Sequence, residues 1–127
     1  MTQLSEVMRR EYLSVAPEDT LGEVAEKMVG AGRGSVVVKD YGRLVGILTE
    51  RDMLKAMAGR VHTSESRVRE WMTPEPVTAP PDMSVQDAAD LMLGRNFRHL
   101  IVVEGESVVG SVSLRAVTRA LTQASPA

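Results

Sequence analysis

The sequence predicts an α/β (α+β) fold in which two β-α-β-β-α repeats pack about a pseudo-two-fold axis. The first supporting observation is an internal repeat: residues 7–52 align with residues 71–116 at a constant offset of 64, and ten of these 46 pairs are identical. The second is that each half carries the apolar spacing of an amphipathic helix, followed by two short runs rich in β-branched residues. A duplicated order of elements follows from these two patterns.

The helix pattern occurs once in each half. Thr20 with Glu23, and Ser84 with Asp87, give each predicted helix a hydroxyl and an acid at capping-box spacing. The apolar positions recur at i, i+3, i+4, i+7 and i+8. They are Leu21, Val24, Ala25, Met28 and Val29 in the first half, and Val85, Ala88, Ala89, Met92 and Leu93 in the second.

Short, apolar segments rich in β-branched residues predict the strands. A turn signal, "DYGR" or "EGES", joins the two central strands of each half. A second helix is expected after each hairpin, and a short strand before each first helix. The expected ranges are strands at 13–15, 35–40, 44–48, 76–78, 99–104 and 108–113, and second helices at about 50–59 and 114–122.

These elements divide the chain into two repeats. We expect repeat 1 at 5–59, a connector at 60–70, repeat 2 at 71–122 and a flexible tail at 123–127. A single repeat of about 55 residues buries too little surface to be stable alone. The two repeats are therefore expected to pack on each other.

Composition excludes several classes of function. The chain has 127 residues, a formal charge of −2 and no cysteine, so disulfides and thiolate metal sites are excluded, and two histidines give no basis for a metal site. Lys and Arg are scattered, which argues against nucleic-acid binding. No apolar run is long enough to span a membrane, and the polar N-terminus does not resemble a secretory signal. We expect a cytoplasmic protein with no membrane partner.

The segment Gly46–Asp52, "GILTERD", has two interpretations. Thr49 and Asp52 have the spacing of a helix N-cap, and the same pair could hold a ribose or a phosphate. The two roles do not exclude each other. "GAGRG" at residues 30–34 follows a predicted helix and precedes a strand, so it indicates a helix C-cap and turn and not a dinucleotide-binding loop. His62 lies in the connector and is interpreted as solvated.

The duplicated pattern resembles a tandem pair of CBS domains, a Bateman module, in stand-alone form. The first half carries "VMRREYLSVAPEDTLGEVAEKM" and "GSVVVKDYGRLVGILTERDML", and the second "WMTPEPVTAPPDMSVQDAADLM" and "FRHLIVVEGESVVGSVSLRAV". The resemblance implies a regulatory module without catalytic activity. By this resemblance, the chain is expected to bind AMP, ADP, ATP or S-adenosylmethionine in the cleft between the repeats, to form a disc-like homodimer and to signal occupancy to an effector protein.

The resemblance also implies site residues. In the pattern G-h-x-[TS]-x-x-D, the acid accepts hydrogen bonds from a ribose diol and the hydroxyl touches ribose or phosphate. Gly46, Ile47, Thr49 and Asp52 match it. Arg98 and His99 match the opposite wall, where they would contact phosphate; their alternative role is as solvated residues at a strand end. The adenine would contact Ile47, Pro76, Val77 and Thr78.

The symmetry-related site is expected to be weak or empty. Ser113 retains the hydroxyl, but Ala116 stands where the first repeat has its acid. Leu13, Ser14 and Ser35 would complete this site. Ile101 replaces the proline that the family usually has after "RHL".

A ligand-free dimerisation or protein-interaction module is the main alternative, because the second acid is missing. Enzymatic activity lacks support, since no nucleophile-base set and no catalytic pair of carboxylates is evident in the sequence.

Overall fold

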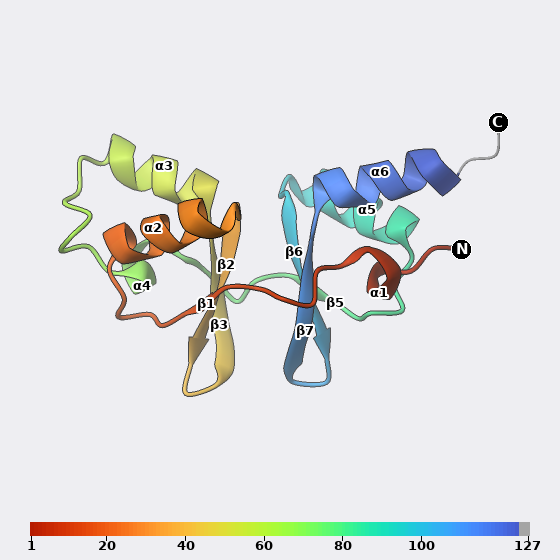
Figure 1. Cartoon of the computed structure of the whole chain (residues 1–127), viewed down its shortest axis with the longest axis horizontal. Helices are drawn as coiled ribbons and strands as arrows, with labels where there is room; N and C mark the ends of the chain where they lie inside the picture. Colours follow the sequence, from red (N-terminus) through yellow and green to blue (C-terminus); the bar gives the residue numbers. More distant parts are fainter. Residues whose placement is uncertain (125–127) are drawn as a thin grey trace. The chain divides into compact units, whose positions relative to one another are not determined.

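The computed structural model describes residues 1–124 and has a mixed α+β fold with two sheets. The chain forms two compact units. Unit 1 combines residues 1–11 with the chain from Val77 onward, and unit 2 is Tyr12–Pro76. Both orders of elements can be followed in Figure 1.

Unit 2 contains a four-stranded sheet in the order β1-β2-β3-β4. β1 is parallel to β2, whereas β2 with β3 and β3 with β4 are antiparallel. The elements are β1 (Ser14–Val15), α2 (Leu21–Ala31), β2 (Ser35–Asp40), β3 (Arg43–Thr49), α3 (Glu50–Ala58), α4 (Val68–Trp71) and β4 (Thr73–Pro74).

Unit 1 contains a three-stranded sheet in the order β5-β6-β7, with the same parallel and antiparallel pairings. A bridge between Arg9 and Ser111 takes the place that the pairing of Thr73 with Ile47 has in unit 2. The elements are α1 (Leu4–Val7), β5 (Thr78–Ala79), α5 (Val85–Arg95), β6 (His99–Glu104), β7 (Ser107–Ser113) and α6 (Leu114–Ala124).

The predicted β-α-β-β-α order is confirmed in both halves. Thr20 and Ser84 accept hydrogen bonds from the backbone N–H of Glu23 and Asp87, as the capping spacing predicted. Gly32 ends α2 in the left-handed conformation, which glycine adopts without penalty, so "GAGRG" is a helix C-cap and turn. β5 begins two residues later than the expected strand at 76–78.

Two ends of elements differ from the expected ranges. α6 continues to Ala124, so the first residues of the expected tail at 123–127 are helical, and 125–127 lie outside the described residues. The expected connector at 60–70 includes the first residues of α4, which begins at Val68.

The short helices α1 (Leu4–Val7) and α4 (Val68–Trp71) lie 64 residues apart in the sequence. Each packs in the unit whose other elements come mainly from the opposite half of the chain. Leu4 on α1 is fully buried in the core of unit 1, which otherwise consists of residues from 79 onward. Val68 on α4, 64 residues later, is fully buried in the core of unit 2. α1 lies beside α6, and α4 lies beside α3 (Figure 1). Each unit is therefore completed by a segment that is distant in sequence.

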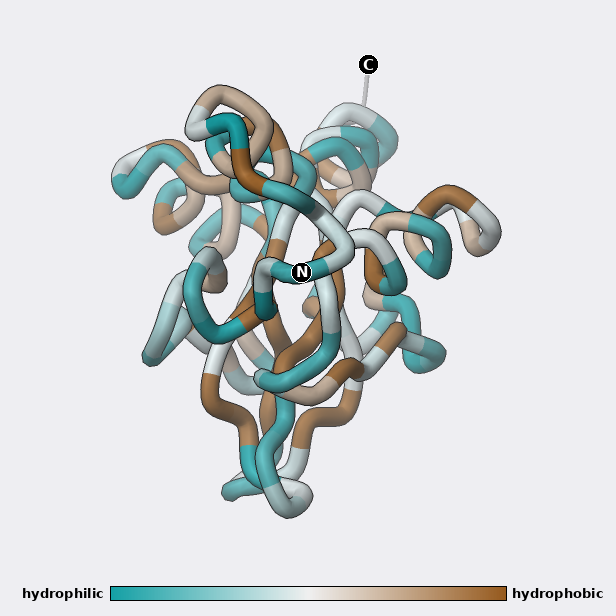
Figure 2. Tube along the Cα trace, turned by 90° about the vertical axis from the view of Figure 1, so that its left-hand side faces the viewer, coloured by the Kyte–Doolittle hydropathy of each residue, from teal (hydrophilic) through white to brown (hydrophobic). Residues whose placement is uncertain are grey.

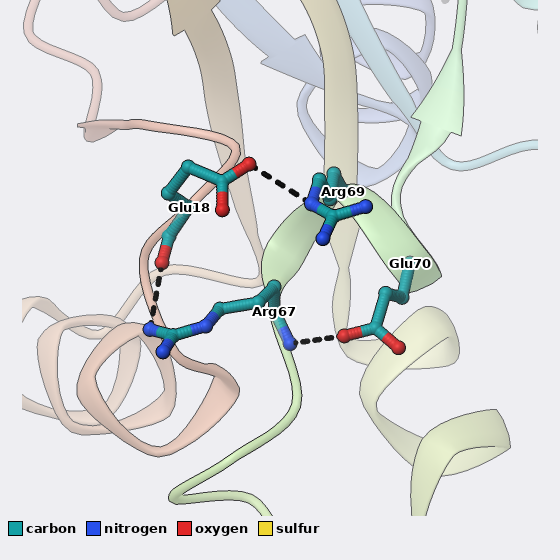
Figure 3. A network of polar contacts seen from close by, with 4 residues as sticks. All are labelled: Glu18, Arg67, Arg69 and Glu70. Carbon is teal, nitrogen blue, oxygen red and sulfur yellow. Dashed lines mark hydrogen bonds and ion pairs between the residues drawn. The ribbon is translucent and has the colours of Figure 1, made fainter.

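The same backbone hydrogen bonds attach both short helices. The N–H of Leu4 donates to the carbonyl oxygen of Met83 at 2.9 Å, and the N–H of Val68 donates to that of Asp19 at 2.9 Å. Around α4, side chains add to this attachment (Figure 3). Arg67 Nη1 donates to the carbonyl oxygen of Glu18 at 3.0 Å, and Arg69 Nε lies 2.9 Å from Glu18 Oε1.

The apolar residues are concentrated in the strands and on the helix faces that cover them. Figure 2 shows hydrophobic colour along the strands and hydrophilic colour at the hairpin ends. Val36, Val38 and Leu48 in unit 2, and Leu100 and Val102 in unit 1, are buried in the two cores. Within residues 1–124, the helices are all too short or too polar to cross a membrane.

Candidate functional site

Thr49 and Asp52 lie at the point where β3 ends and α3 begins. The backbone N–H of Asp52 donates to Thr49 Oγ1 at 3.3 Å. In return, Asp52 Oδ2 accepts from the backbone N–H of Thr49 at 3.0 Å and from its hydroxyl at 3.2 Å. This is a complete capping box, so the helix-cap interpretation of the sequence is confirmed.

Asp52 is also buried, with 7% of its surface exposed. Among the residues that the structure describes, it is the single charged side chain in the buried class. Burying a carboxylate is costly unless hydrogen bonds and favourable dipoles compensate. Here the two donors of Thr49 and the positive end of the α3 dipole provide that compensation. An ionised carboxylate has about four acceptor positions, and both of these bonds end on Oδ2, so Asp52 has capacity for further donors.

Two other helix starts, those of α2 and α6, show what capping alone requires. Thr20 and Glu23 form the same box at the start of α2, but in an exposed position, and the hydrogen bond from the Thr20 hydroxyl lowers the pKa of the Glu23 carboxyl. At the start of α6, Ser113 Oγ accepts from the N–H of Ala116 at 3.1 Å, and no acid is present at that position. A helix at this point of the repeat thus forms with a hydroxyl alone. The buried acid is the feature particular to the first repeat.

Gly46, the first residue of the matched pattern, is fixed by packing. A Cβ at this position would lie 2.7 Å from Met72 Sδ and 3.0 Å from the carbonyl oxygen of Thr73. Its counterpart Gly110 is equally crowded, because a Cβ there would lie 2.7 Å from the carbonyl oxygen of Arg9 and 2.9 Å from Met8 Sδ. The sequence interpretation missed this role. The signal for it was present, since glycine and methionine are each identical in both repeats.

The residues expected to form the main site divide between the two units. Ile47, Thr49, Asp52 and Pro76 belong to unit 2, whereas Val77, Thr78, Arg98 and His99 belong to unit 1. Within unit 2, hydrogen bonds join Thr49 to Asp52, and Ile47 is buried on β3. Within unit 1, Arg98 is exposed, and its carbonyl oxygen accepts from the N–H of Leu114 at 2.8 Å. The contribution of Arg98 and His99 to a ligand site stays a prediction.

Sheet register pairs residues that had been assigned to different sites. Ser35, expected in the weaker site, lies opposite Thr49 in the pairing of β2 with β3. His99 lies opposite Ser113 in the equivalent pairing of β6 with β7.

The rest of the weaker set lies at the start of unit 2. The carbonyl oxygen of Leu13 accepts from the N–H of Val37, and Ser14 is exposed on β1. By the sheet register, each unit places the hydroxyl at a helix start, Thr49 or Ser113, opposite the first residue of its central strand, Ser35 or His99.

Comparison with known proteins decides the family. The model of the CBS domain matches this chain twice, at residues 4–59 and 68–123. The chain belongs to the CBS-domain family. The two matched ranges begin with α1 and α4, so each CBS sequence repeat includes the short helix that packs in the other unit.

Two relatives that match over most of their own length support the assignment to this family. An uncharacterised 17.7 kDa protein of Acidianus ambivalens is 38% identical over 122 residues, which are 94% of this chain and 73% of that protein. The CBS domain-containing protein YhcV of Bacillus subtilis is 32% identical over 114 residues, 90% of this chain and 81% of the relative.

Solved structures share the fold over nearly the whole chain. A putative signal-transduction protein with CBS domains from Burkholderia ambifaria has a TM-score of 0.92 at 23% identity, covering 99% of this chain and 98% of that one. The CBS domain pair of protein MJ0100, solved with 5′-methylthioadenosine and S-adenosyl-L-methionine, has a TM-score of 0.88 at 25% identity, covering 98% and 99%. The resemblance to a tandem CBS pair is thus confirmed by the two family-model matches and by the shared fold.

Proposed function

We propose that this CBS pair is a regulatory module that binds an adenosine-containing ligand, with Asp52 accepting the ribose hydroxyls. The observation that carries the proposal is the burial of the Asp52 carboxylate at a helix start whose repeat counterpart, Ala116, has no acid. Capping explains the hydroxyl that the two repeats share, and a diol-binding role explains the additional acid.

Two further observations support an adenosine compound. The N-terminus of α3 offers backbone N–H groups and a positive dipole beside Thr49, which suits a phosphate or another anionic group. The MJ0100 pair holds 5′-methylthioadenosine and S-adenosylmethionine, which share the adenosine group. The module acts by binding and not by catalysis, and an effect on an effector protein requires that the ligand prefer one of two states of the module.

The test is calorimetric titration with AMP, ADP, ATP, S-adenosylmethionine and 5′-methylthioadenosine. Asp52→Asn keeps an acceptor for Thr49 but removes the charge, and we expect it to weaken binding about 10- to 100-fold, because hydrogen bonds to charged groups contribute about 1.5–3 kcal/mol. Glu23→Gln is the matched control, since Glu23 holds the same position in an exposed capping box of the same unit. It should leave affinity unchanged.

Two results would contradict the proposal. Equal affinity of wild type and Asp52→Asn would show that the acid is only a cap. Failure of the wild type to bind each compound up to millimolar concentration would favour the ligand-free interaction module. Thermal melting of both variants checks that they remain folded.

A further inference from the structure

Two methionines occupy equivalent positions directly after the short helices. Met8 ends α1 and Met72 ends α4, and their backbone N–H groups donate to the carbonyl oxygens of Leu4 and Val68, each at 2.8 Å. Both methionine side chains are half-buried. Met8 packs against the core of unit 1 and Met72 against the core of unit 2. Each methionine therefore helps to join a short helix to the unit that the helix completes.

The sulfur atoms of these methionines lie against glycines of the central hairpins. A Cβ at Gly46 would lie 2.7 Å from Met72 Sδ, and a Cβ at Gly110 would lie 2.9 Å from Met8 Sδ. Real Cβ atoms do not approach other atoms so closely, so the space beside each glycine is already filled by a thioether. The same crowded contact thus occurs once in each unit.

Backbone pairing with the sheet begins at the residue after each methionine. Thr73 pairs with Ile47 on β3. Arg9 and Ser111 exchange two hydrogen bonds, in which the N–H of Arg9 donates at 2.8 Å and the N–H of Ser111 donates at 3.0 Å. Each methionine lies between the buried residue of a short helix and the first residue paired with the sheet. A displaced methionine side chain would therefore disturb the attachment on both sides.

The thioether of methionine has a reversible oxidation chemistry. Hydrogen peroxide transfers one oxygen atom to the sulfur, which gives a sulfoxide and water, and methionine sulfoxide reductases reverse the change with a thiol reductant. The sulfoxide is larger and polar, and its oxygen is a hydrogen-bond acceptor. At the two glycine contacts the nearest polar backbone atoms are the carbonyl oxygens of Thr73 and Arg9, which also accept. A sulfoxide in these contacts would be both crowded and poorly solvated.

We propose that Met8 and Met72 are reversible oxidation sites, and that conversion of either sulfur to the sulfoxide detaches its short helix from the unit that the helix completes. Half-burial leaves each side chain within reach of a peroxide, while the contact with glycine makes the structure sensitive to the added oxygen. Because the chain has no cysteine, methionine is its main reversible target for a peroxide.

Other methionines of the chain differ in burial and provide internal comparisons. Met57 on α3 is 67% exposed, so its sulfoxide would be solvated and would change the structure little. Met28 and Met92 are buried in the two cores, at 6% and 0% exposure, and are shielded from peroxide in the folded chain. Met8 and Met72 combine access with tight packing, and the proposal therefore concerns these two positions.

The test is mild oxidation of the full chain with hydrogen peroxide. Mass spectrometry of peptides measures the sulfoxide at each methionine, and hydrogen exchange measures the attachment of residues 4–9 and 68–73. We expect sulfoxide at Met8 and Met72 to be accompanied by about 10- to 100-fold faster exchange in these two segments, since an unsatisfied polar group in an apolar contact costs this much in the equilibrium constant for opening. A methionine sulfoxide reductase with dithiothreitol should restore the original exchange rates.

Leucine substitutions assign the effect to single sulfur atoms. Leucine keeps the apolar volume of methionine and cannot be oxidised by peroxide. After the same treatment, Met72→Leu should keep residues 68–73 protected while residues 4–9 still exchange faster, and Met8→Leu should show the reverse. Met57→Leu is the matched control and should respond as the wild type does. Thermal melting before oxidation checks that each variant is folded.

Three results would overturn the proposal. One is sulfoxide at Met8 and Met72 with unchanged exchange in both segments. Another is resistance of both methionines to peroxide concentrations that oxidise Met57 completely. The third is equal loss of protection in Met57→Leu, Met8→Leu and Met72→Leu, which would place the damage elsewhere. The wild-type results alone decide the first two, so they hold even if a leucine variant is unstable, and none of the three depends on adenosine binding.

Discussion

Gly46 and Gly110 are the residues whose identity the packing fixes most directly. Each glycine faces a methionine and a backbone carbonyl from the segment that directly follows α1 or α4. These are Met72 and Thr73 for Gly46, and Met8 and Arg9 for Gly110. A glycine in a sheet often marks such a close approach of another backbone. The glycine that opens the ligand-binding pattern therefore has a structural role in both repeats, including the repeat that lacks the acid.

Alanine substitutions at these glycines should show that role. We expect Gly110→Ala and Gly46→Ala to lower the free energy of unfolding by about 1–3 kcal/mol, as overpacking does. Gly110→Ala should cost more, because its closest neighbour is a backbone oxygen, whereas the closest neighbour of Gly46 is the end of a flexible methionine. Urea unfolding measures both.

The controls are two helix glycines with open space around them. Gly30 on α2 and Gly94 on α5 have no atom within 4 Å of an added Cβ, so alanine there should raise stability, by about 0.5–1 kcal/mol. If Gly110→Ala behaved like Gly94→Ala, the close approach would not constrain the residue.

The sequence predicted the cap at Thr49 and Asp52 because capping is a local interaction over three residues. It could not predict that Asp52 is buried while the equivalent acid Glu23 is exposed, because burial depends on tertiary packing. The ribose assignment came from family resemblance, and the difference in burial is what now distinguishes Asp52 from an ordinary capping acid.

At the scale of elements, the predicted strands and long helices were found because each has a periodic apolar pattern. α1 and α4 are only four residues long, too short for a helical period to be recognised. That each of them packs in the unit formed mainly by the opposite half of the chain could not be predicted either. Leu4 and Val68 occupy equivalent positions, and the two cores are similar, so local pattern does not decide which core receives which residue.

Leu4→Ala measures how strongly α1 stabilises unit 1. Leu4 is fully buried, so we expect a loss of about 2–5 kcal/mol in the free energy of unfolding. Ser5→Ala, in the same helix but only half-buried, is the control and should change stability by less than about 0.5 kcal/mol. Equal effects of the two substitutions would show that α1 contributes little to the core.

The side chains that reinforce α4 are a weaker source of stability. The ion pair between Arg69 and Glu18 is exposed, and such pairs contribute about 1 kcal/mol or less. Its counterparts in unit 1, Ser5 and Asp82, do not form an ion pair. Both short helices are therefore held mainly by one buried apolar residue and the backbone hydrogen bonds that the units share.

At the scale of the whole molecule, the compact units do not coincide with the sequence repeats. Residues 1–11 are joined covalently to Tyr12 of unit 2, yet they complete the core of unit 1. A substitution near the N-terminus is therefore expected to destabilise the second half of the chain first. This arrangement couples the repeats, because neither core is complete without a segment of the other repeat.

Removal of residues 1–11 should reveal this coupling. The loss of Leu4, and of the strand-like contact between Arg9 and Ser111, should loosen unit 1 and leave unit 2, which retains α4, largely unchanged. Hydrogen exchange measured by mass spectrometry should therefore show faster exchange in residues 77–124 than in the full chain, with protection kept in residues 12–76. If the faster hydrogen exchange were confined to residues 12–30, next to the cut, the N-terminal segment would not complete the core of unit 1, and its assignment to that unit would be wrong. Ser5→Ala in the full chain is the control for a change at the surface of the N-terminal segment. In this variant both units should keep their protection from hydrogen exchange.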